Sequence, residues 1–501
     1  MQAFDYYSEL GVTRDASPEE IRRAYHKAAR EIHPDVSNEK DANEQFLRVQ
    51  AAYDVLSDPE KRIKYDQGLP PQEKTGPVIG LNTLYSRKNL LKINEPQLLF
   101  VLLELTAPPN AKTRPSPPLN VCLIIDRSTS MRGERMDTVK NTAIDLIRQL
   151  RPEDHISIVT FSDRAEVIVS GGKVADKKEI EKKIFMIQTG GGTEIFHGLE
   201  AGFFEVRSRF SHDFTNQLIL LTDGRTYGDE EACLRLADQA ASTGIGINGL
   251  GIGSEWNDSF LDSLATRTGG SSVYLEGPHK IEKLLRENFL RLGQIYAERV
   301  SFEFHIKPGI ELRYAFRLSP DANPIGLSSP VRLGNIPKEP SLVVLLEFLI
   351  DPIVSFSGTL PIAEGQISMD IPTRAVPHYM LSMQLSRDVS EVEDFQPPPA
   401  RLIQAVSKLN LYRMQERANQ FLVDGNPEDA SRHLHNLATH LFSQGQHHLA
   451  RTTLEEAENI AQKRGLSEAG KKSIKYGTRS LLLPPSLTEA AIEPSPEKGD
   501  R

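Results

Sequence analysis

Cysteine is nearly absent from this sequence, since only Cys122 and Cys233 occur among its 501 residues. Two cysteines exclude a disulfide scaffold and a cysteine-rich zinc ribbon, and they favour a reducing compartment. No apolar run reaches the roughly 20 residues that span a bilayer. The longest run, SLVVLLEFLI, is short and contains Glu347. The first residues, MQAFDYYSEL, lack the basic and apolar regions of a secretory signal. We therefore expect a soluble, cytoplasmic protein.

An excess of basic residues is also missing. Asp and Glu together number 68 against 59 Lys and Arg, which gives a formal net charge of −9. A protein that binds nucleic acid usually shows the opposite balance, so we expect no nucleic-acid partner. The hydrophobic fraction of 39% and the charged fraction of 25% are ordinary for a globular protein. At roughly 150 residues per domain, the length predicts three or four domains.

Proline-rich and glycine-rich stretches divide the chain into segments of different character. Residues 1–66 show helical periodicity, residues 119–296 alternate apolar strands with amphipathic helices, and residues 401–482 are again helical. Strand patterns fill residues 78–118 and 297–387. The remaining stretches are predicted to be linkers at 67–77 and 388–400 and a disordered tail at 483–501.

This order of segments predicts a multidomain architecture. Alternating strands and helices indicate a doubly wound α/β domain with a mostly parallel sheet. The strand patterns on either side of it predict one β-sandwich into which the α/β domain is inserted. The C-terminal helices follow the glycine turns at Gly425 and Gly445, which suits either a hairpin array distantly like tetratricopeptide repeats or a plain bundle.

The N-terminal segment reads as helices around a short polar loop. Ser17-Pro18-Glu19-Glu20 is a capping box that opens a helix to Ile32. A second long helix is predicted over residues 41–57, and a short last helix over EKRIKYD. The first long helix has an apolar face and, away from it, a basic stripe of Arg22, Arg23, His26, Lys27 and Arg30. His33-Pro34-Asp35 lies between the two long helices.

Three features of this segment together resemble a J-domain, namely DYYSELGV, the basic helix that runs into His33-Pro34-Asp35, and SDPEKRIKYD. The resemblance covers residues 1–66 and implies docking on a DnaK-type chaperone and acceleration of its ATP hydrolysis. It implies that His33 and Asp35 make the triggering contacts, that Pro34 stiffens the loop, and that the basic stripe binds an acidic surface. In isolation, the stripe would better suit a solvated helix face.

The α/β segment places oxygen-bearing side chains at the ends of predicted strands. The buried strand at 119–125 ends at Asp126 and is followed by Ser128 and Ser130, and a second strand at 217–222 ends at Asp223. Thr193 closes the glycine-rich loop TGGGT. Ligands bind at the carboxyl ends of strands in such sheets. Hard oxygen ligands suit Mg²⁺, or Ca²⁺ or Mn²⁺, rather than zinc.

Two other interpretations of these residues remain open. The aspartate and serines could cap the next helix, and TGGGT could cradle a phosphate. Against the phosphate, no P-loop lysine follows the glycines, and the two aspartates would repel an anion.

The pattern resembles the von Willebrand factor A-type domain and its metal-ion-dependent adhesion site, over about residues 119–296. The resemblance implies that Ser128 and Ser130 ligate the ion directly, while Asp126, Thr193 and Asp223 act directly or through water. It also implies that an acidic residue of a protein client completes the shell. Such capture would shift the helix near residues 280–296, which is predicted to run straight into the sandwich.

The sequence thus predicts a J-protein co-chaperone that recruits and stimulates a DnaK-type ATPase at a client bound through the metal site. We expect no catalytic residues, no enzyme activity and no membrane partner. The alternative is a metal-dependent assembly adaptor, working with a AAA-type machine, in which the J-domain is secondary. A Mg²⁺-dependent hydrolase is a third and weaker hypothesis, because no histidine base accompanies the serines in a nucleophile motif.

Overall fold

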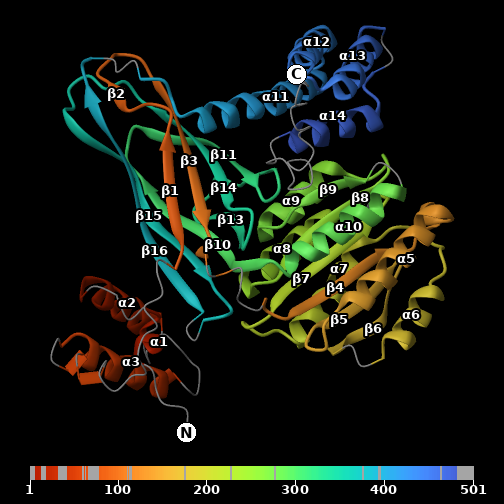
Figure 1. The fold of residues 1–501 in the computed structure, drawn as a ribbon, viewed down its shortest axis with the longest axis horizontal. Coiled ribbons are helices and arrows are strands. Elements are labelled where there is room, and N and C mark those ends of the chain that lie inside the picture. Colours follow the sequence, from red (N-terminus) through yellow and green to blue (C-terminus); the bar gives the residue numbers. More distant parts are fainter. Residues whose placement is uncertain are drawn as a thin grey trace, which may run out of the picture.

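The computed structural model divides into four parts that follow one another along the chain, apart from one insertion (Figure 1). These parts are a helical N-terminal part, a β-sandwich, an α/β domain and a C-terminal set of helices. The structure describes residues 6–12, 18–31, 42–58, 61–62, 64–65, 78–109, 111, 116–173, 176–225, 228–275, 278–374, 377–392, 396–462 and 465–481.

The α/β domain is built on a six-stranded sheet in the order β6-β5-β4-β7-β8-β9. All pairs are parallel except β5 with β6, which is an antiparallel edge. The central strands are apolar on both faces because both faces are covered by helices. The strands are β4 (Leu119–Asp126), β5 (His155–Phe161), β6 (Ala165–Lys173), β7 (Thr215–Thr222), β8 (Gly246–Ile252) and β9 (Ser272–Leu275).

Side-chain alternation along β4 divides the interior of this domain into two cores. Val121 and Leu123 face the helices α5 (Glu134–Gln149), α6 (Lys177–Phe185) and α10 (Pro278–Leu292). Cys122 and Ile124 face α7 (Ile195–Ser208), α8 (Glu230–Thr243) and α9 (Asp258–Thr268). Both cysteines are buried and free, and burial raises the pKa of the Cys122 thiol to about 12, so they act as small apolar side chains.

Two five-stranded sheets form the β-sandwich, in the orders β1-β3-β14-β11-β12 and β13-β10-β15-β16-β2, around one apolar core. The chain leaves it after β3 and returns at β10, so the α/β domain is inserted as predicted. The strands are β1 (Gly80–Tyr85), β2 (Asn89–Leu91), β3 (Gln97–Thr106), β10 (Ile295–Ile306), β11 (Ile310–Ser319), β12 (Asn323–Pro324), β13 (Val331–Pro337), β14 (Leu342–Ile350), β15 (Gly358–Asp370) and β16 (His378–Ser390).

The connection from the α/β domain into the sandwich differs from the prediction. Helix α10 ends at Leu292 rather than near residue 296, and β10 already begins at Ile295. The reason is local hydrogen bonding: Gln294 N–H donates to Arg291 O in a turn, and Lys338 N–H donates to Gln294 O. A two-residue turn, not a continuous helix, therefore joins the two domains.

Three helices are described in the N-terminal part, α1 (Tyr6–Leu10), α2 (Pro18–Glu31) and α3 (Ala42–Leu56). Tyr7, Ile21 and Val49 are buried between them, and the Tyr25 and Tyr53 rings stack with centroids 4.1 Å apart. The predicted apolar faces of the two long helices do pack together. His33, Pro34, Asp35, Ile32 and part of the predicted last helix lie outside the described residues.

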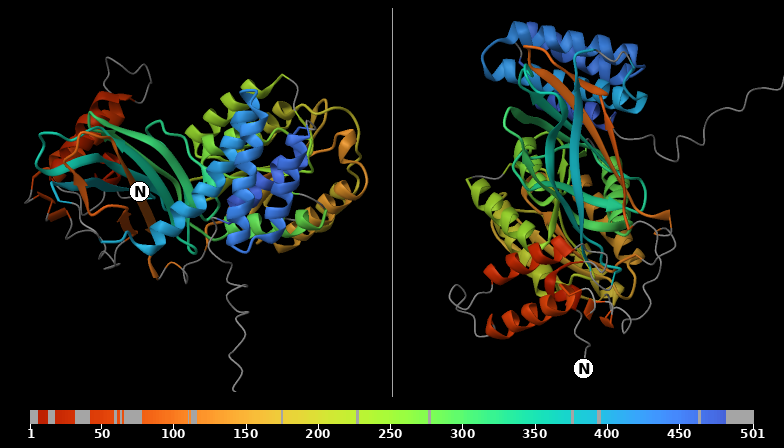
Figure 2. Two further views of the ribbon diagram at one scale, coloured as in Figure 1. Left: turned by 90° about the horizontal axis from the view of Figure 1, so that it is seen from above. Right: turned by 90° about the vertical axis from the view of Figure 1, so that its left-hand side faces the viewer.

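The C-terminal helices are α11 (Ala400–Val423), α12 (Pro427–Ser443), α13 (His447–Ala461) and α14 (Glu468–Ser480). Gly425 and Gly445 have φ values of 78° and 75°, so the predicted glycine turns are present. Helix α11 crosses from the sandwich to the other three helices, which lie over the α/β domain (Figures 1 and 2). None of the helices within the described ranges combines the length and apolar character that crossing a lipid bilayer requires.

Helix α14 is attached to the α/β domain by buried ion pairs. Arg479 donates to both carboxylate oxygens of Asp262 on α9, at 2.9 and 2.5 Å. Lys475 lies 2.8 Å from the same carboxylate and also pairs with Asp258. Arg479 further donates to the Tyr412 hydroxyl on α11 at 3.1 Å. These contacts fix the C-terminal helices against the α/β domain.

Candidate metal centre

The loop after β4 holds Asp126 and two serines in a compact arrangement. Asp126 is fully buried. Its Oδ1 accepts a hydrogen bond from the Ser128 backbone N–H at 2.8 Å, and its Oδ2 accepts one from the Thr222 hydroxyl at 2.7 Å. Ser128 then precedes a short 3₁₀ turn that leads into α5. The carboxylate is therefore oriented by the loop that it precedes and by the neighbouring strand β7.

A chain of side-chain hydrogen bonds joins this loop to the end of β7. The Ser128 and Ser130 hydroxyl oxygens lie 3.0 Å apart, and Ser130 donates to Asp223 Oδ1 at 2.6 Å. Because β4 and β7 are parallel neighbours, their carboxyl ends bring Asp126 and Asp223 to one edge of the sheet. The D-x-S-x-S loop and the end of β7 at Asp223 therefore lie together, as predicted.

The glycine-rich loop supplies the fifth predicted residue, Thr193. Gly191 O accepts hydrogen bonds from the Thr129 backbone N–H at 3.2 Å and from its hydroxyl at 3.1 Å, which holds this loop against the D-x-S-x-S loop. Gly191 has a φ of 86°, a conformation that favours glycine. Thr193 is buried against Gly224, where an added Cβ would lie 2.9 Å from the Thr193 hydroxyl.

A basic residue that the sequence reasoning missed completes the cluster. Arg135 Nη1 lies 2.6 Å from Asp223 Oδ2, and the Asp223 side chain is entirely buried. Burial raises the pKa of Asp126, and the negative charge of Asp223 adds to this effect. The sequence did contain a signal for an acidic partner of Arg135. This residue lies in the first turn of α5, where the helix dipole disfavours a cation unless an anion is near.

The donor set suits a hard divalent cation. Two carboxylates and three hydroxyls converge here without a histidine or cysteine, which is oxygen chemistry of the kind that Mg²⁺ and Ca²⁺ prefer. Over the described ranges, no group of three or more His, Cys, Asp and Glu side chains is placed to hold a metal. A metal site in that part of the chain would therefore need other oxygen ligands besides carboxylates, such as hydroxyl, amide or backbone carbonyl groups.

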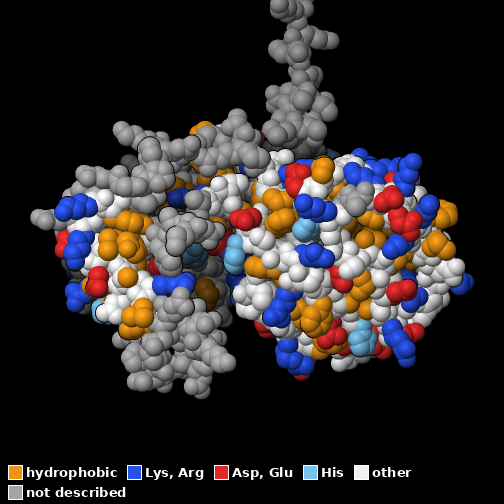
Figure 3. Space-filling model, turned by 90° about the horizontal axis from the view of Figure 1, so that it is seen from below, with side chains coloured by type: hydrophobic (Ala, Val, Ile, Leu, Met, Phe, Trp, Pro, Cys, Tyr) orange, Lys and Arg blue, Asp and Glu red, His pale blue; other side chains and the backbone are white. Residues whose placement is uncertain are grey.

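The predicted chaperone-binding stripe is only partly visible. Arg22, Arg23, His26 and Lys27 are exposed on α2, while the side chain of Arg30 is among those not described. Arg23 and Lys27 also line a groove whose other wall comes from β10, β15 and β16. Over the α/β domain, the face in Figure 3 mixes basic and acidic side chains.

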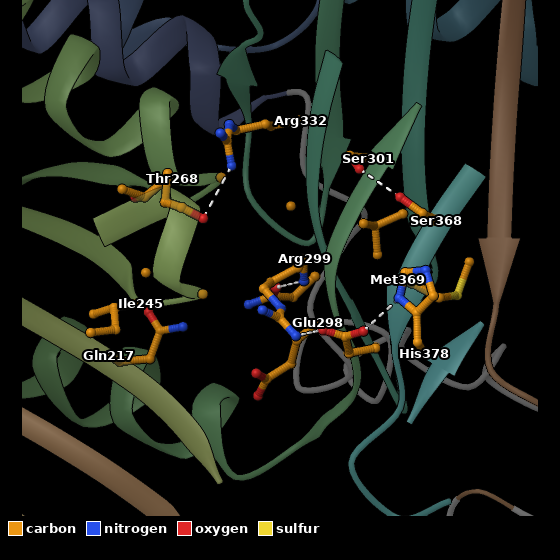
Figure 4. Close-up of a pocket in the computed structure, with 18 residues that line it drawn as sticks. Gln217, Ile245, Thr268, Glu298, Arg299, Ser301, Arg332, Ser368, Met369 and His378 are labelled. Carbon is orange, nitrogen blue, oxygen red and sulfur yellow. Dashed lines mark hydrogen bonds and ion pairs between the residues drawn. The ribbon is translucent and has the colours of Figure 1, made fainter. Parts of the chain in front are cut away.

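A second polar cluster lies at the opposite end of the sheet, where the α/β domain meets the sandwich (Figure 4). It surrounds a cavity of about 250 Å³. Arg299 adopts a φ of 54°, donates toward Asp370 and lies 3.3 Å from His212 Nδ1. Burial raises the pKa of the neighbouring Glu298 to about 7. This cluster belongs to the domain junction, and nothing in the sequence motifs pointed to it.

Comparison with known proteins assigns the domains. A DnaJ domain model matches residues 5–66, a von Willebrand factor type A domain model residues 120–286, and a model of the Sll0103-like C-terminal alpha-helical domain residues 400–484. The uncharacterized protein sll0103 of Synechocystis sp. is 28% identical over 379 residues, which are 74% of this chain and 89% of that protein.

Other similarities cover either one domain or the fold alone. Chaperone protein DnaJ of Shouchella clausii is 55% identical over 67 residues, only 13% of this chain and 18% of that protein. A von Willebrand factor type A protein from Catenulispora acidiphila has a TM-score of 0.62 at 14% identity and covers 81% of this chain and 98% of its own. The ArnB paralog VWA2 from Sulfolobus acidocaldarius has a TM-score of 0.52 at 16% identity, covering 81% and 100%.

The chain is therefore a multidomain protein with an N-terminal DnaJ domain, a von Willebrand factor type A (VWA) domain with additional β-sheets, and a C-terminal Sll0103-like helical domain. The predicted J-domain and VWA domain are confirmed, whereas the metal-ion-dependent adhesion site stays a prediction. The DnaJ domain implies a DnaK-type chaperone as a partner. DnaJ and VWA domains are typically non-catalytic, and their combination suggests a co-chaperone with a protein-binding module.

Proposed function

We propose that this chain is a J-protein co-chaperone that recruits a DnaK-type ATPase to a client held by the VWA domain through a divalent cation. The observation that carries the proposal is the hydrogen-bonded chain Ser128–Ser130–Asp223 beside the buried Asp126, in the same polypeptide as a DnaJ domain. The chain itself would contribute no catalytic group and would act as an activator of the partner's ATP hydrolysis.

The five clustered residues, Asp126, Ser128, Ser130, Thr193 and Asp223, would hold Mg²⁺, or Ca²⁺ or Mn²⁺. The ion would supply a positive charge for an acidic side chain of the client. Two carboxylates are few for a divalent cation, and Arg135 already neutralises part of the charge of Asp223. An Asp or Glu of the client would add the missing negative charge and a further oxygen ligand.

The co-chaperone part is tested by single-turnover ATP hydrolysis of a DnaK-type chaperone. The His33→Gln variant should lose the stimulation, because the resemblance assigns the triggering contact to this residue. The matched control is His448→Gln on the exposed side of α13, which should stimulate as well as wild type. Undiminished stimulation by the His33 variant would contradict the proposal.

The client-binding part is tested by capture on the immobilised full chain. Capture should be lost in EDTA, restored by excess Mg²⁺ and absent with Asp126→Ala, while Thr129→Ala at a variable motif position should retain it. Replacing the acidic residues of the captured client one by one should then identify the ligand. Capture that survives both EDTA and the complete acidic scan would show that the metal site does not hold the client.

Processing of the captured client by the His33 variant distinguishes this proposal from the assembly-adaptor alternative. If client processing continues unchanged when His33 is replaced, the metal-dependent adaptor is the correct description and the DnaJ domain is secondary.

A further inference from the structure

A wide groove lies where α11 leaves the sandwich and approaches the VWA domain. We call it the α11 groove. Its volume is about 1330 Å³, and its walls come from β3, β11, β14, α9, α11, α12 and α14. Pockets for small molecules usually measure about 300–1,000 Å³. The α11 groove is larger than this, so its dimensions suit a peptide segment.

The apolar part of the α11 groove follows from the alternation of side chains along β3. Leu99, Val101 and Leu103 point into the sandwich core, whereas Leu102 points outward and is covered by α11. Leu98 and Phe100 share the outward face with Leu102 and line the α11 groove, and Phe100 also packs against the cluster around Leu102. Leu98 is 39% exposed.

Helix α11 supplies the facing wall. Met414 and Val423 line it, and Val423 is 81% exposed. Apolar side chains therefore flank the groove on both sides.

The charge of the α11 groove is opposite to that of the whole chain. Its lining contains five cationic side chains and three acidic ones, in a protein with a net charge of −9. The three acids are already engaged: Glu347 pairs with Arg413 at 2.6 Å, Asp258 pairs with Lys475, and Glu416 accepts from the Tyr314 hydroxyl at 3.3 Å.

Two of the cations have no acidic partner. Arg313 on β11 and Arg417 on α11 are exposed, and neither forms an ion pair with any residue of the described ranges. They stand on opposite walls of the α11 groove. Two unneutralised guanidinium groups beside apolar side chains complement a ligand that is both acidic and apolar.

A buried side chain adds an unused hydrogen-bond acceptor. Gln415 lines the α11 groove and is only 2% exposed, yet its Oε1 has no hydrogen-bond partner within the part of the chain that the structure describes. Leaving a buried polar atom without a hydrogen-bond partner is unfavourable. A backbone N–H of a bound peptide would satisfy it.

We propose that the α11 groove binds an extended client segment in which acidic and apolar residues alternate. Acidic side chains would pair with Arg313 and Arg417, apolar ones would cover Leu98 and Met414, and a backbone N–H would donate to Gln415. This second client contact uses no residue of the metal centre and is therefore independent of the divalent cation.

The probe is a fluorescein-labelled eight-residue peptide of alternating leucine and glutamate, measured by fluorescence anisotropy with the full chain. It should bind, and the Arg313→Ser/Arg417→Ser double variant should weaken binding by at least about tenfold, since each lost charge-assisted contact removes binding free energy. Arg451→Ser, which removes an exposed arginine on α13 outside the α11 groove, should leave binding unchanged.

Further measurements distinguish this site from the metal centre and the proposed peptide from other occupants. Binding should persist in EDTA and with Asp126→Ala, and peptides of alternating leucine and lysine or of serine and glutamate should bind more weakly. An affinity unchanged by the double variant, or loss of binding in EDTA, would overturn the proposal. So would sedimentation showing a dimer that the double variant dissociates, since a second copy would then be the occupant.

Discussion

The guanidinium of Arg135 and the carboxylate of Asp223, 88 residues apart in the chain, form an ion pair with Nη1 2.6 Å from Oδ2. The carboxylate is wholly buried, and its other oxygen accepts from Ser130. Arg135 thus supplies the positive charge that a buried carboxylate needs. The same pairing would compete with a metal ion for Asp223.

Removing this competition should tighten metal binding. We predict that Arg135→Ala lowers the dissociation constant for Mg²⁺ about tenfold, because one nearby positive charge is lost and Asp223 Oδ2 is freed. Isothermal titration calorimetry measures the change. Arg132→Ala is the matched control, since Arg132 is exposed in the same loop, and its effect should be much smaller. Weaker binding in the Arg135 variant would instead make this residue a positioning partner of Asp223.

Deleting ligand oxygens should abolish metal binding. Asp126→Ala and Thr193→Ala each remove one predicted ligand group from a sparse set, so neither variant should give heat in a Mg²⁺ titration. Wild type at a Mg²⁺ concentration 100 times its dissociation constant should gain about 2.7 kcal/mol of stability, which EDTA removes. Thr129→Ala should still bind Mg²⁺, because Thr129 is not a predicted ligand and its backbone N–H still donates to Gly191 O when the hydroxyl is removed. Unchanged titrations in both ligand variants would mean that the ion binds elsewhere.

The buried Glu298 should make stability depend on pH. Burial raises its pKa from 4.5 to about 7 in the folded protein. The folded state therefore holds a proton that the unfolded chain loses above about pH 4.5, so this group's stabilising contribution falls as the pH rises from 4.5 to 7. The loss amounts to about 3 kcal/mol and is complete above pH 7.

The test compares the free energy of unfolding of wild type and Glu298→Gln in urea at several pH values. The difference between them should change steadily over pH 4.5–7, because glutamine cannot ionise. Glu311→Gln on the exposed side of β11 is the control and should run parallel to wild type. A constant difference between the Glu298 variant and wild type would refute the assignment.

Breaking the junction between α9 and α14 should destabilise the C-terminal helices. The Arg479 and Lys475 charges hold the pKa of Asp262 far below its usual range. Asp262→Asn leaves the buried Arg479 without its acidic partner, while Lys475 keeps its pair with Asp258, and the change should cost about 3–5 kcal/mol. The measurements are urea unfolding and the rate of proteolysis in α14. Asp238→Asn, which removes an exposed pair with Arg267, should cost no more than about 1 kcal/mol.

Much of the fold and the candidate site followed from local patterns. The apolar run of β4, the D-x-S-x-S loop after it, the TGGGT loop and the strand ending at Asp223 predicted a cluster of five oxygen-bearing side chains, because parallel neighbouring strands end at one edge of a sheet. The capping box and the apolar faces of the first helices predicted the helical pairing seen through Tyr25 and Tyr53. Such signals depend on residues a few positions apart.

Tertiary structure alone decided the contacts between segments far apart in the chain. Arg135 with Asp223, and Arg479 with Asp262 across 217 residues, are pairs that no periodicity specifies. The same holds for Glu298, whose raised pKa results from burial at a domain junction. An ion pair or a desolvated carboxylate exists only when packing brings its surroundings together. The sequence alone therefore determined the domains and the candidate ligands. The tertiary structure determined which neighbours surround the buried carboxylates and so whether these are charged.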